Sequence, residues 1–348
     1  MTTLFKQPPS SICILRLSAI GDVCHALAAV QALQRHWPNT QVTWIIGKIE
    51  YQLLKDSPGI EFIVYDKHSG YAGMKALWQQ LQGRRFDALV HMQLALRASL
   101  LTAGIRAKYK IGFNFKRAKE LQWLFTNRKI QDTESAHVLD SFFSFIEYLG
   151  VPRSQPQWQL AISADDKALV QQWLQNKPTV AICPAASKDE RNWLPERYAA
   201  IADYVAEKGY QVVLCGSPAE REIQLAASIS AKMHTQALNL VGKTSLKQLA
   251  AVLGACKLVI APDSGPAHIA TTQYTPVLGL YAHSNPNRTG PYNNVNDVVS
   301  VYEQAVEQQQ GKPADTLPWS TRAKGEHLMA NISLEQVQEK IDYLLAKS

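Results

Sequence analysis

Apolar and polar residues follow two different rhythms along the chain. Short runs rich in β-branched and aromatic residues alternate with longer segments in which apolar residues recur every three or four positions. The short runs are typical of buried strands, and the longer pattern is typical of amphipathic helices. In the first half of the chain the predicted strands are 11–17, 41–46, 60–65, 86–91 and 108–113.

The segment after the first predicted strand shows the helical rhythm most clearly. In 23–36 the residues Val23, Leu27 and Val30 fall on one stripe of a helix. A strand, a tight turn and a helix that recur in this order predict a parallel sheet with crossover helices.

The same rhythm restarts in the second half of the chain, after the turn-rich stretch GVPRSQPQ at 150–157. We therefore predict two α/β domains joined near 152–177. The polar, turn-rich segment 306–328 is expected to be a long surface loop, and a last helix is expected to begin at Ser333. The predicted strands are 178–187, 210–215, 237–241, 257–262 and 276–281, and the predicted helices are 163–175, 195–208, 218–232, 244–254 and 265–273.

Composition agrees with a two-domain soluble protein. The chain has 348 residues, of which 46% are hydrophobic and 19% charged, and a domain typically takes about 150 residues. The first residues contain no apolar signal core, and the apolar runs are shorter than the ~20 residues of a membrane span. We therefore expect a cytoplasmic protein without a transmembrane segment.

Cysteine usage and charge narrow the picture further. The five cysteines include no C-x-x-C pair, so buried free thiols are expected in place of disulfides or zinc ligands. The net charge of +7 suggests an anionic partner. Nucleic acid, acidic lipid surfaces and phosphorylated sugars all fit that charge.

Several nucleotide and metal fingerprints are absent from the sequence. No G-x-G-x-x-G follows a predicted strand, so a nicotinamide or flavin site is not expected. The string GKTS at 242–245 lacks the glycine of a phosphate loop, because position 237 is Ala237. There is no D-x-D and no H-E-x-x-H, so no metal site is expected.

The first stretch that could carry chemistry is SAIGDVCHAL at 18–27, directly after the first predicted strand. Asp22 stands in the first turn of the predicted helix, where a carboxylate can cap backbone N–H groups. It also stands at a strand end, where ligands bind in open α/β sheets and where it could accept a proton from a hydroxyl. Gly21 would let a ligand approach the backbone, and Ser18 precedes it.

Three strand ends in the second half carry further candidates. The stretch 184–198 places Ser187, Lys188 and Arg191 where a pyrophosphate could be held, although basic loop residues are often simply solvated. In 258–272, the sequence Asp263-Ser264-Gly265 opens a short helix whose free N–H groups could bind an anion.

Two of these strand ends contain residues with two interpretations. His268 lies about one turn into the short helix, where it could face the ligand or serve only in packing. In 214–222, Glu220 or Glu222 could hold ribose hydroxyls, or could be a plain helix-terminus charge.

The stretch 106–120 is strongly basic, with six lysines and arginines before Glu120, among them Lys108, Lys110 and Lys116. Interleaved aromatic residues make single-stranded nucleic acid a candidate ligand. An anionic acceptor or membrane headgroups fit better, because no RNA-binding motif accompanies the stretch. A solvated basic face is the simpler alternative.

Taken together, the motifs resemble glycosyltransferase family 9, the ADP-heptose:lipopolysaccharide heptosyltransferases. The resemblance runs over roughly 11–305 and rests on motifs in the family's order. These are LRLSAIGDVCHALAAVQAL, a basic loop ending in W-x-P, APDSGPAHIA and HSNPNRTGPY.

The resemblance implies an α/β protein of the GT-B fold, with two Rossmann-like domains facing across a cleft. The implied division is an acceptor-binding domain at 1–160, an ADP-sugar-binding domain at 161–330 and a C-terminal helix at 331–348 that packs back on the first domain. It also implies inversion at the anomeric carbon, no metal or other cofactor, and ADP-L-glycero-D-manno-heptose as donor.

Site residues carry over position by position. Asp22 matches the family's general base, and Arg191 takes the place of a basic residue that meets the donor phosphates. Many members have lysine there, whereas arginine can clamp phosphate with two bonds but cannot act as a proton donor. The implied donor-binding set is Ser187, Lys188, Arg191, Glu220, Asp263, Ser264, Gly265 and His268, and the expected acceptor-binding set is Ser18, Gly21, Lys108, Lys110 and Lys116.

The function expected from this resemblance is heptose transfer to 3-deoxy-D-manno-octulosonate (Kdo) on lipid A, at the cytoplasmic face of the inner membrane. The turn SNPNRTGPY resembles members that add the first heptose. The alternatives are transfer to a later core residue, a different sugar nucleotide, a sugar-nucleotide 2-epimerase on the same fold, and a non-catalytic basic protein that binds nucleic acid or anionic lipid. Nucleic acid is not an expected partner of the transferase.

Overall fold

The computed structural model describes residues 3–133, 135–318 and 320–347, which divide into two compact units at Ala161 and Ile162. The division lies inside the predicted joining segment. Residues up to 161 stay with the first unit because the Trp158 indole donates to the Cys24 carbonyl oxygen at 2.8 Å. The side chain of Gln31 also binds both backbone groups of Gln159.

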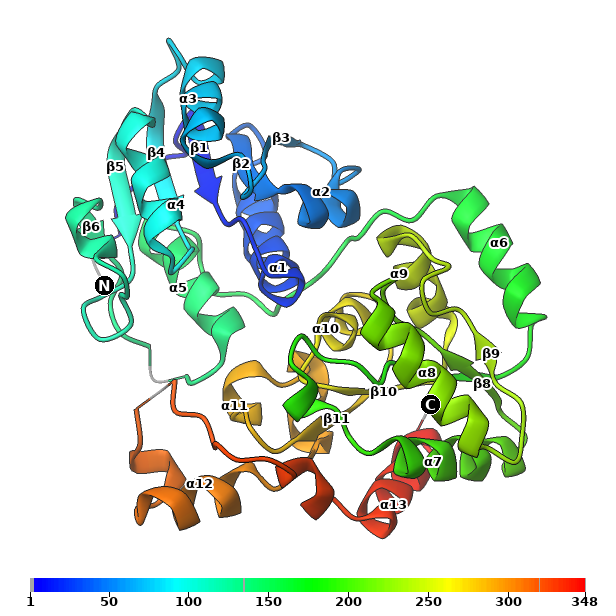
Figure 1. Ribbon diagram of the computed structural model, residues 1–348. Coiled ribbons are helices and arrows are strands. Elements are labelled where there is room, and N and C mark those ends of the chain that lie inside the picture. Colours follow the sequence, from blue (N-terminus) through cyan, green and yellow to red (C-terminus); the bar gives the residue numbers. More distant parts are fainter. Residues whose placement is uncertain (1–2, 134, 319, 348) are drawn as a thin grey trace. The chain divides into compact units, whose positions relative to one another are not determined.

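The first unit is a six-stranded parallel sheet with the strand order β3-β2-β1-β4-β5-β6 (Figure 1). This is the order of a Rossmann-like fold, in which the chain changes direction between the first and fourth strands. Its elements are β1 (Ser11–Leu15), α1 (Ile20–His36), β2 (Gln41–Gly47), α2 (Lys48–Leu54), β3 (Ile60–Tyr65), α3 (Gly70–Gln80), β4 (Phe86–His91), α4 (Leu96–Leu101), β5 (Ala107–Gly112), β6 (Arg128–Lys129) and α5 (Val138–Leu149).

The second unit repeats the same topology, with the order β12-β11-β10-β7-β8-β9. Here β7 and β10 are the neighbouring strands at which the chain changes direction. Its elements are α6 (Ala164–Leu174), β7 (Thr179–Ile182), α7 (Pro195–Glu207), β8 (Gln211–Leu214), α8 (Glu220–Lys232), β9 (Leu238–Asn239), α9 (Leu246–Ala255), β10 (Leu258–Pro262), α10 (Gly265–Thr272), β11 (Val277–Tyr281), α11 (Pro286–Thr289), β12 (Val299–Ser300), α12 (Tyr302–Gln310) and α13 (Leu334–Leu345).

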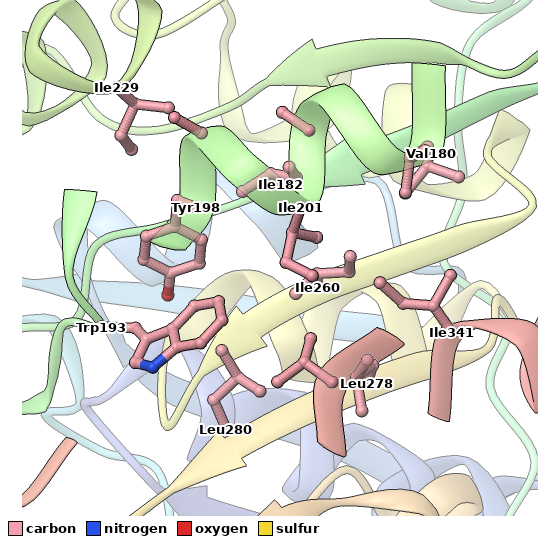
Figure 2. Packing of buried hydrophobic residues seen from close by; sticks show 14 of the residues in the cluster. Val180, Ile182, Trp193, Tyr198, Ile201, Ile229, Ile260, Leu278, Leu280 and Ile341 are labelled. Atoms are coloured by element: carbon pink, nitrogen blue, oxygen red, sulfur yellow. The ribbon is translucent and has the colours of Figure 1, made fainter. Parts of the chain in front are cut away.

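The C-terminal helix α13, which the resemblance implied would pack back on the first unit, contributes to the core of the second. It lies beside α7 (Figure 1). Its residues Val337, Ile341 and Leu344 are buried in one cluster with strand residues such as Leu278, as Figure 2 shows for Ile341 and Leu278. Three apolar residues of α13 are therefore part of the core of the second unit.

The segment expected to be a loop at 306–328 is partly helical. Helix α12 runs to Gln310 because Tyr302, Ala305 and Val306 form a small buried cluster with Ala323. The other predicted elements are present, although the strand predicted at 178–187 is limited to Thr179–Ile182. All five cysteines are buried free thiols, as expected. None of the helices formed by the described parts of the chain is long and apolar enough to cross a bilayer.

Candidate functional site

The carboxyl ends of β1 and β4 bring the first group of candidate residues together. The two strands are hydrogen-bonded neighbours, with Leu15 paired to His91. The residues that follow them, Arg16 to Ser18 and Met92 to Gln93, therefore lie at the point where ligands bind in open parallel sheets.

Asp22 occupies the third position of helix α1 and makes two contacts with the chain. Its carboxylate accepts the backbone N–H of Ala19, the residue before the helix, at 3.3 Å. It also forms an ion pair with the guanidinium of Arg16. The capping contact predicted as one interpretation is thus present, and about a third of the Asp22 side chain, 32%, stays exposed.

Arg16 is a site residue that the sequence reasoning missed. Its side chain is buried, donates to the Met92 carbonyl oxygen at 2.6 Å, and lies over the ring of Phe142. Burial lowers the pKa of Arg16, and the charge of Asp22 opposes that shift. The available signal was a lone arginine between Leu15 and Leu17, because a cation in a buried strand end needs a partner.

Gln93 fixes the backbone that leads from β1 to α1. Its side-chain oxygen accepts the N–H groups of Leu17 and Ser18 at 3.1 and 3.2 Å. Since these bonds satisfy the backbone of the turn, the position of the following Asp22 is set by β4 as well as by β1.

A cavity of about 650 Å³ opens at this edge of the first unit. Of the residues predicted to bind the acceptor, Ser18 lines it. Three basic side chains that the sequence reasoning did not single out also line it, Lys48, Lys67 and Arg97. They follow β2, β3 and β4, so the sheet gathers them although the sequence separates them.

The cavity also contains carboxyl groups, Glu50, Asp66 and Glu120. Burial raises the pKa of Glu50, and the charges of Lys67 and Arg16 partly oppose this shift. The lining therefore combines cations with hydrogen-bonding carboxyl groups, a set suited to an anionic sugar with hydroxyls.

The predicted lysines of the basic stretch have other positions. The Lys110 ammonium donates to the Thr102 carbonyl oxygen at 2.5 Å, and its burial lowers its pKa. Lys108 lies against Tyr109, and Lys116 pairs with Asp132 at 3.2 Å. None of these three lysines lines the cavity.

In the second unit, the carboxyl ends of β7 and β10 bring Arg191 and Asp263 together. Their side chains form an ion pair at 3.2 Å, with 12% and 14% of each exposed. Arg191 stands in the loop after β7, and Asp263 follows β10 directly. Two residues predicted for one site, 72 positions apart, are therefore in contact.

Several buried polar atoms at this edge have no hydrogen-bond partner among the described residues. They follow β7, β10 and β11, and they are Arg191 Nε, Ser264 Oγ, His283 Nε2 and Ser284 Oγ. Buried polar groups of native proteins are almost always satisfied. The cluster therefore indicates an edge built to hydrogen-bond a polar ligand.

The N-terminus of α10 faces the same edge. Ser264 precedes the helix in an extended conformation and makes no side-chain capping bond, and Gly265 is the first helical residue. The free N–H groups of this turn and the helix dipole favour an anion. Proline at 266 removes one of these donors. The predicted His268 is buried one turn further along.

The remaining predicted donor residues are more exposed. Ser187 and Lys188 stand in the loop after β7, and Lys188 pairs with Glu190 at 3.6 Å. Glu220 begins α8, is exposed, and accepts a hydrogen bond from Gln224 at 2.9 Å. The Glu222 carboxylate instead accepts the backbone N–H of Ser217 at 2.7 Å.

Arg221 was missed by the sequence reasoning. It donates to Asp189 at 2.5 Å and to the Ala186 carbonyl oxygen at 2.7 Å. It thereby ties the loop after β7 to the start of α8, and so positions two of the predicted donor segments.

The chain matches a known protein family. The family model "Glycosyltransferase family 9 (heptosyltransferase)" matches residues 74–318. The chain belongs to glycosyltransferase family 9. The family 9 resemblance inferred from the motifs is confirmed, and the protein is a glycosyltransferase.

Individual relatives extend the match to nearly the whole chain of this family 9 enzyme. It is 52% identical over 335 residues to the lipopolysaccharide core heptosyltransferase OpsX of Haemophilus influenzae, covering 96% of each chain. A solved family 9 glycosyltransferase from Veillonella parvula superposes with a TM-score of 0.81 at 23% identity, covering 99% of each chain. The Escherichia coli heptosyltransferase WaaC with ADP has a TM-score of 0.72 at 21% identity, covering 97% and 98%. The predicted GT-B fold of two Rossmann-like units is confirmed.

Proposed function

We propose that this glycosyltransferase moves L-glycero-D-manno-heptose from ADP-heptose to Kdo of the lipopolysaccharide inner core, with inversion and without a metal. The observation that carries the proposal is the set of buried polar atoms without described partners at the carboxyl edge of the second unit. The 52% identity to a lipopolysaccharide core heptosyltransferase supports heptose as the transferred sugar and the lipopolysaccharide core as the product.

The donor would bind to the second unit. Arg191 would turn its guanidinium toward the diphosphate, and Asp263, already paired with it, would hold the guanidinium in place. Ser264 Oγ and the N–H groups at Gly265 would donate hydrogen bonds to the diphosphate as well. Ser187, Lys188, Glu220 and His268 complete the proposed set, with Glu220 assigned to the ribose.

These donors would also stabilise the leaving group. When the bond between the anomeric carbon and the diphosphate oxygen breaks, its electron pair goes to ADP, which gains negative charge. A preorganised guanidinium and a helix N-terminus stabilise such charge without any reorganisation. For this reason we propose a metal-independent reaction.

Asp22 would supply the base from the first unit. The acceptor hydroxyl forms a new bond to the anomeric carbon, and its proton passes to the Asp22 carboxylate. A base needs to lie within hydrogen-bond reach of that proton. Asp22 meets the requirement of accessibility, since its carboxylate is partly exposed even while paired with Arg16.

The acceptor sugar would occupy the cavity of the first unit. Kdo carries a carboxylate, which would pair with Lys48, Lys67 or Arg97, and several hydroxyls, which would hydrogen-bond to Glu50. Ser18 stays in the proposed acceptor set with Gly21. We propose Lys48, Lys67 and Arg97 as the primary anion contacts in place of Lys108, Lys110 and Lys116. We also propose that the enzyme acts at the cytoplasmic face of the inner membrane.

The deciding experiment measures ADP release from ADP-L-glycero-D-manno-heptose by the purified protein, with and without Kdo-lipid A, in the presence of EDTA. Release that requires the acceptor and persists in EDTA is the expected result. Release that requires a heptosylated core acceptor would move the enzyme to a later step. Conversion of the donor without any acceptor would point to an epimerase and would overturn the proposal.

A further inference from the structure

The loop that follows β5 exposes a group of large apolar side chains. Phe115, Leu121, Trp123 and Leu124 are 68%, 51%, 43% and 58% exposed. We call these four residues the apolar patch. Single exposed apolar residues are common on protein surfaces, but four within ten positions need a reason.

The two aromatic residues of the patch lie close together. The rings of Phe115 and Trp123 lie 6.3 Å apart between centroids. Lys129 of β6, which pairs with β5 at the edge of the sheet, places its ammonium 3.4 Å from the centroid of the Phe115 ring. Figure 1 shows this loop at the β5–β6 edge of the first unit.

Buried anchors hold the loop, so the exposure of the patch is a property of the fold. The side chain of Gln122 is fully buried and donates to the His91 carbonyl oxygen at 2.9 Å, while its own oxygen accepts the N–H of Phe113 at 3.0 Å. Arg117 is also buried and donates to the carbonyl oxygens of Thr133 and Ser135. With Gln122 turned inward, its neighbours Leu121 and Trp123 are left outside.

The patch lies in a basic segment of the chain. Residues 106–129 contain eight lysines and arginines and a single acidic residue, Glu120. Arg117 is buried, and Lys110 is tied to Thr102. Of the cations nearest in sequence, Lys116, Lys119 and Arg128 are exposed and Lys129 is half-buried, and Lys116 pairs with Asp132. Exposed apolar side chains next to lysines and arginines complement a lipid bilayer, which has anionic headgroups and an apolar interior.

We propose that the apolar patch and its lysines and arginines dock the enzyme on an anionic phospholipid bilayer. Trp123 and Phe115 would lie at the headgroup level, where aromatic rings are favoured, and Leu121 and Leu124 would reach the acyl boundary. The cations would bind lipid phosphates. A protein partner fits less well, because the cores of protein interfaces are depleted of lysine.

The position of the patch relative to the cavity supports this assignment and rests on the proposed function. Glu120 lines the cavity, where its carboxylate accepts the N–H of Leu96 at 2.5 Å, and the next residue is Leu121 of the patch. A bilayer in contact with the patch would thus lie at the margin of the cavity. A sugar acceptor carried by a lipid could enter the cavity while its acyl chains remain in the membrane.

Vesicle sedimentation tests the docking surface without relying on activity. The full-length protein is mixed with phosphatidylcholine vesicles, with or without about 30% phosphatidylglycerol. We expect binding to the anionic vesicles that weakens with salt, and about tenfold weaker binding for the variant with Phe115→Ser and Leu124→Ser. The matched control carries Tyr71→Ser and Ile223→Ser, two exposed apolar positions away from the loop, 70% and 41% exposed.

A second variant and a second readout complete the test. Arg128→Gln with Lys129→Gln is expected to remove most of the preference for anionic vesicles. The patch variant is expected to turn over a deacylated, water-soluble acceptor at the wild-type rate but to lose most activity on vesicle-embedded acceptor. If no acceptor is turned over while anionic vesicles are still bound, the proposed function fails and the docking surface stands.

Three results would overturn the docking surface. One is equal sedimentation of the wild type with neutral and anionic vesicles. Another is unchanged binding by both loop variants. The third is a wild-type dimer that the Phe115→Ser, Leu124→Ser variant converts to monomer, because the patch would then be a contact between copies of this chain.

Discussion

The two units share one strand order, and each places its candidate residues after the carboxyl ends of its parallel strands. Their local organisation differs. In the first unit the Asp22 carboxylate is already engaged by Arg16 and the Ala19 N–H, and Gln93 satisfies the turn before it. In the second, Ser264 Oγ and Arg191 Nε are buried without partners among the described residues.

This difference corresponds to the two kinds of substrate group that the proposed reaction requires. A neutral hydroxyl brings no charge to the site, so the base that meets it has to be held by the protein itself. A diphosphate brings strong acceptors, so the site that meets it has to present spare donors. In the proposed reaction, the edge at Asp22 holds a base of the protein itself, whereas the edge at Ser264 receives the charge of the donor.

The strongest test of this contrast replaces Asp22 with asparagine. The amide oxygen can still accept the Ala19 N–H, but the side chain can no longer take a proton. We expect kcat to fall by about a thousandfold, in the range of lost general-base catalysis, with an unchanged affinity for ADP. Steady-state kinetics and calorimetric titration with ADP measure the two effects. A variant that keeps a tenth of the activity would exclude Asp22 as the base.

The corresponding change in the second unit is Arg191→Gln. Loss of the guanidinium would remove the proposed charged hydrogen bonds to the diphosphate, and it leaves Asp263 without its ion-pair partner. We expect kcat/KM for ADP-heptose to fall by about a hundredfold, since charge-assisted bonds contribute about 1.5–3 kcal/mol each. The KM for the acceptor is expected to stay within about twofold.

Asp263→Asn is the matched control for that variant. It keeps the guanidinium and removes only the charge that orients it, so its effect on kcat/KM is expected to be smaller. Equal losses in both variants would mean that Asp263 contacts the donor directly.

His91 gives the first unit a dependence of stability on pH. It is fully buried, which together with the charge of Arg16 lowers its pKa to about 3. In the unfolded chain a histidine titrates near pH 6.5. Below that pH the unfolded state binds a proton that the folded state does not, so stability falls as the pH decreases toward 3.

The expected decrease below pH 6 is about 1.4 kcal/mol per pH unit from this residue. Urea unfolding of the wild type and of His91→Gln, at pH 7.5, 6 and 5, measures it. The variant should start less stable, because the contact with Ser99 at 3.1 Å is altered, but should lose less on acidification. Parallel curves would show that His91 is not the group responsible.

Residue patterns predicted the central strands well because these strands are short, apolar and bounded by turns. They did not predict α2, since its seven residues follow β2 with no loop between the two elements. They also did not predict β12, whose two residues are ordered by pairing with β11. Both elements depend on tertiary contacts that no local window contains.

Candidate site residues could be predicted where a single sequence motif contains them. They could not be predicted where residues from distant segments meet only in the folded sheet. Asp22 and Asp263 stand in recognisable turns. Lys48, Lys67 and Arg97 become neighbours only because β2, β3 and β4 end at the same edge. The charge of a lysine in a sequence does not reveal whether its ammonium binds a carbonyl oxygen of its own unit, as that of Lys110 does.

Arg16 offers the finest test of the contrast between the units, through the substitution Arg16→Lys. The charge near Asp22 is kept, but an ammonium cannot span both the Met92 carbonyl oxygen and the Asp22 carboxylate as the planar guanidinium does. We expect kcat to fall about tenfold with the acceptor KM nearly unchanged, since a less well-oriented base affects the proton transfer more than binding. Thermal unfolding controls for misfolding. An unchanged kcat would mean that Arg16 does not orient the Asp22 carboxylate for proton transfer. The Ala19 N–H contact would then be the interaction that holds this carboxylate in place.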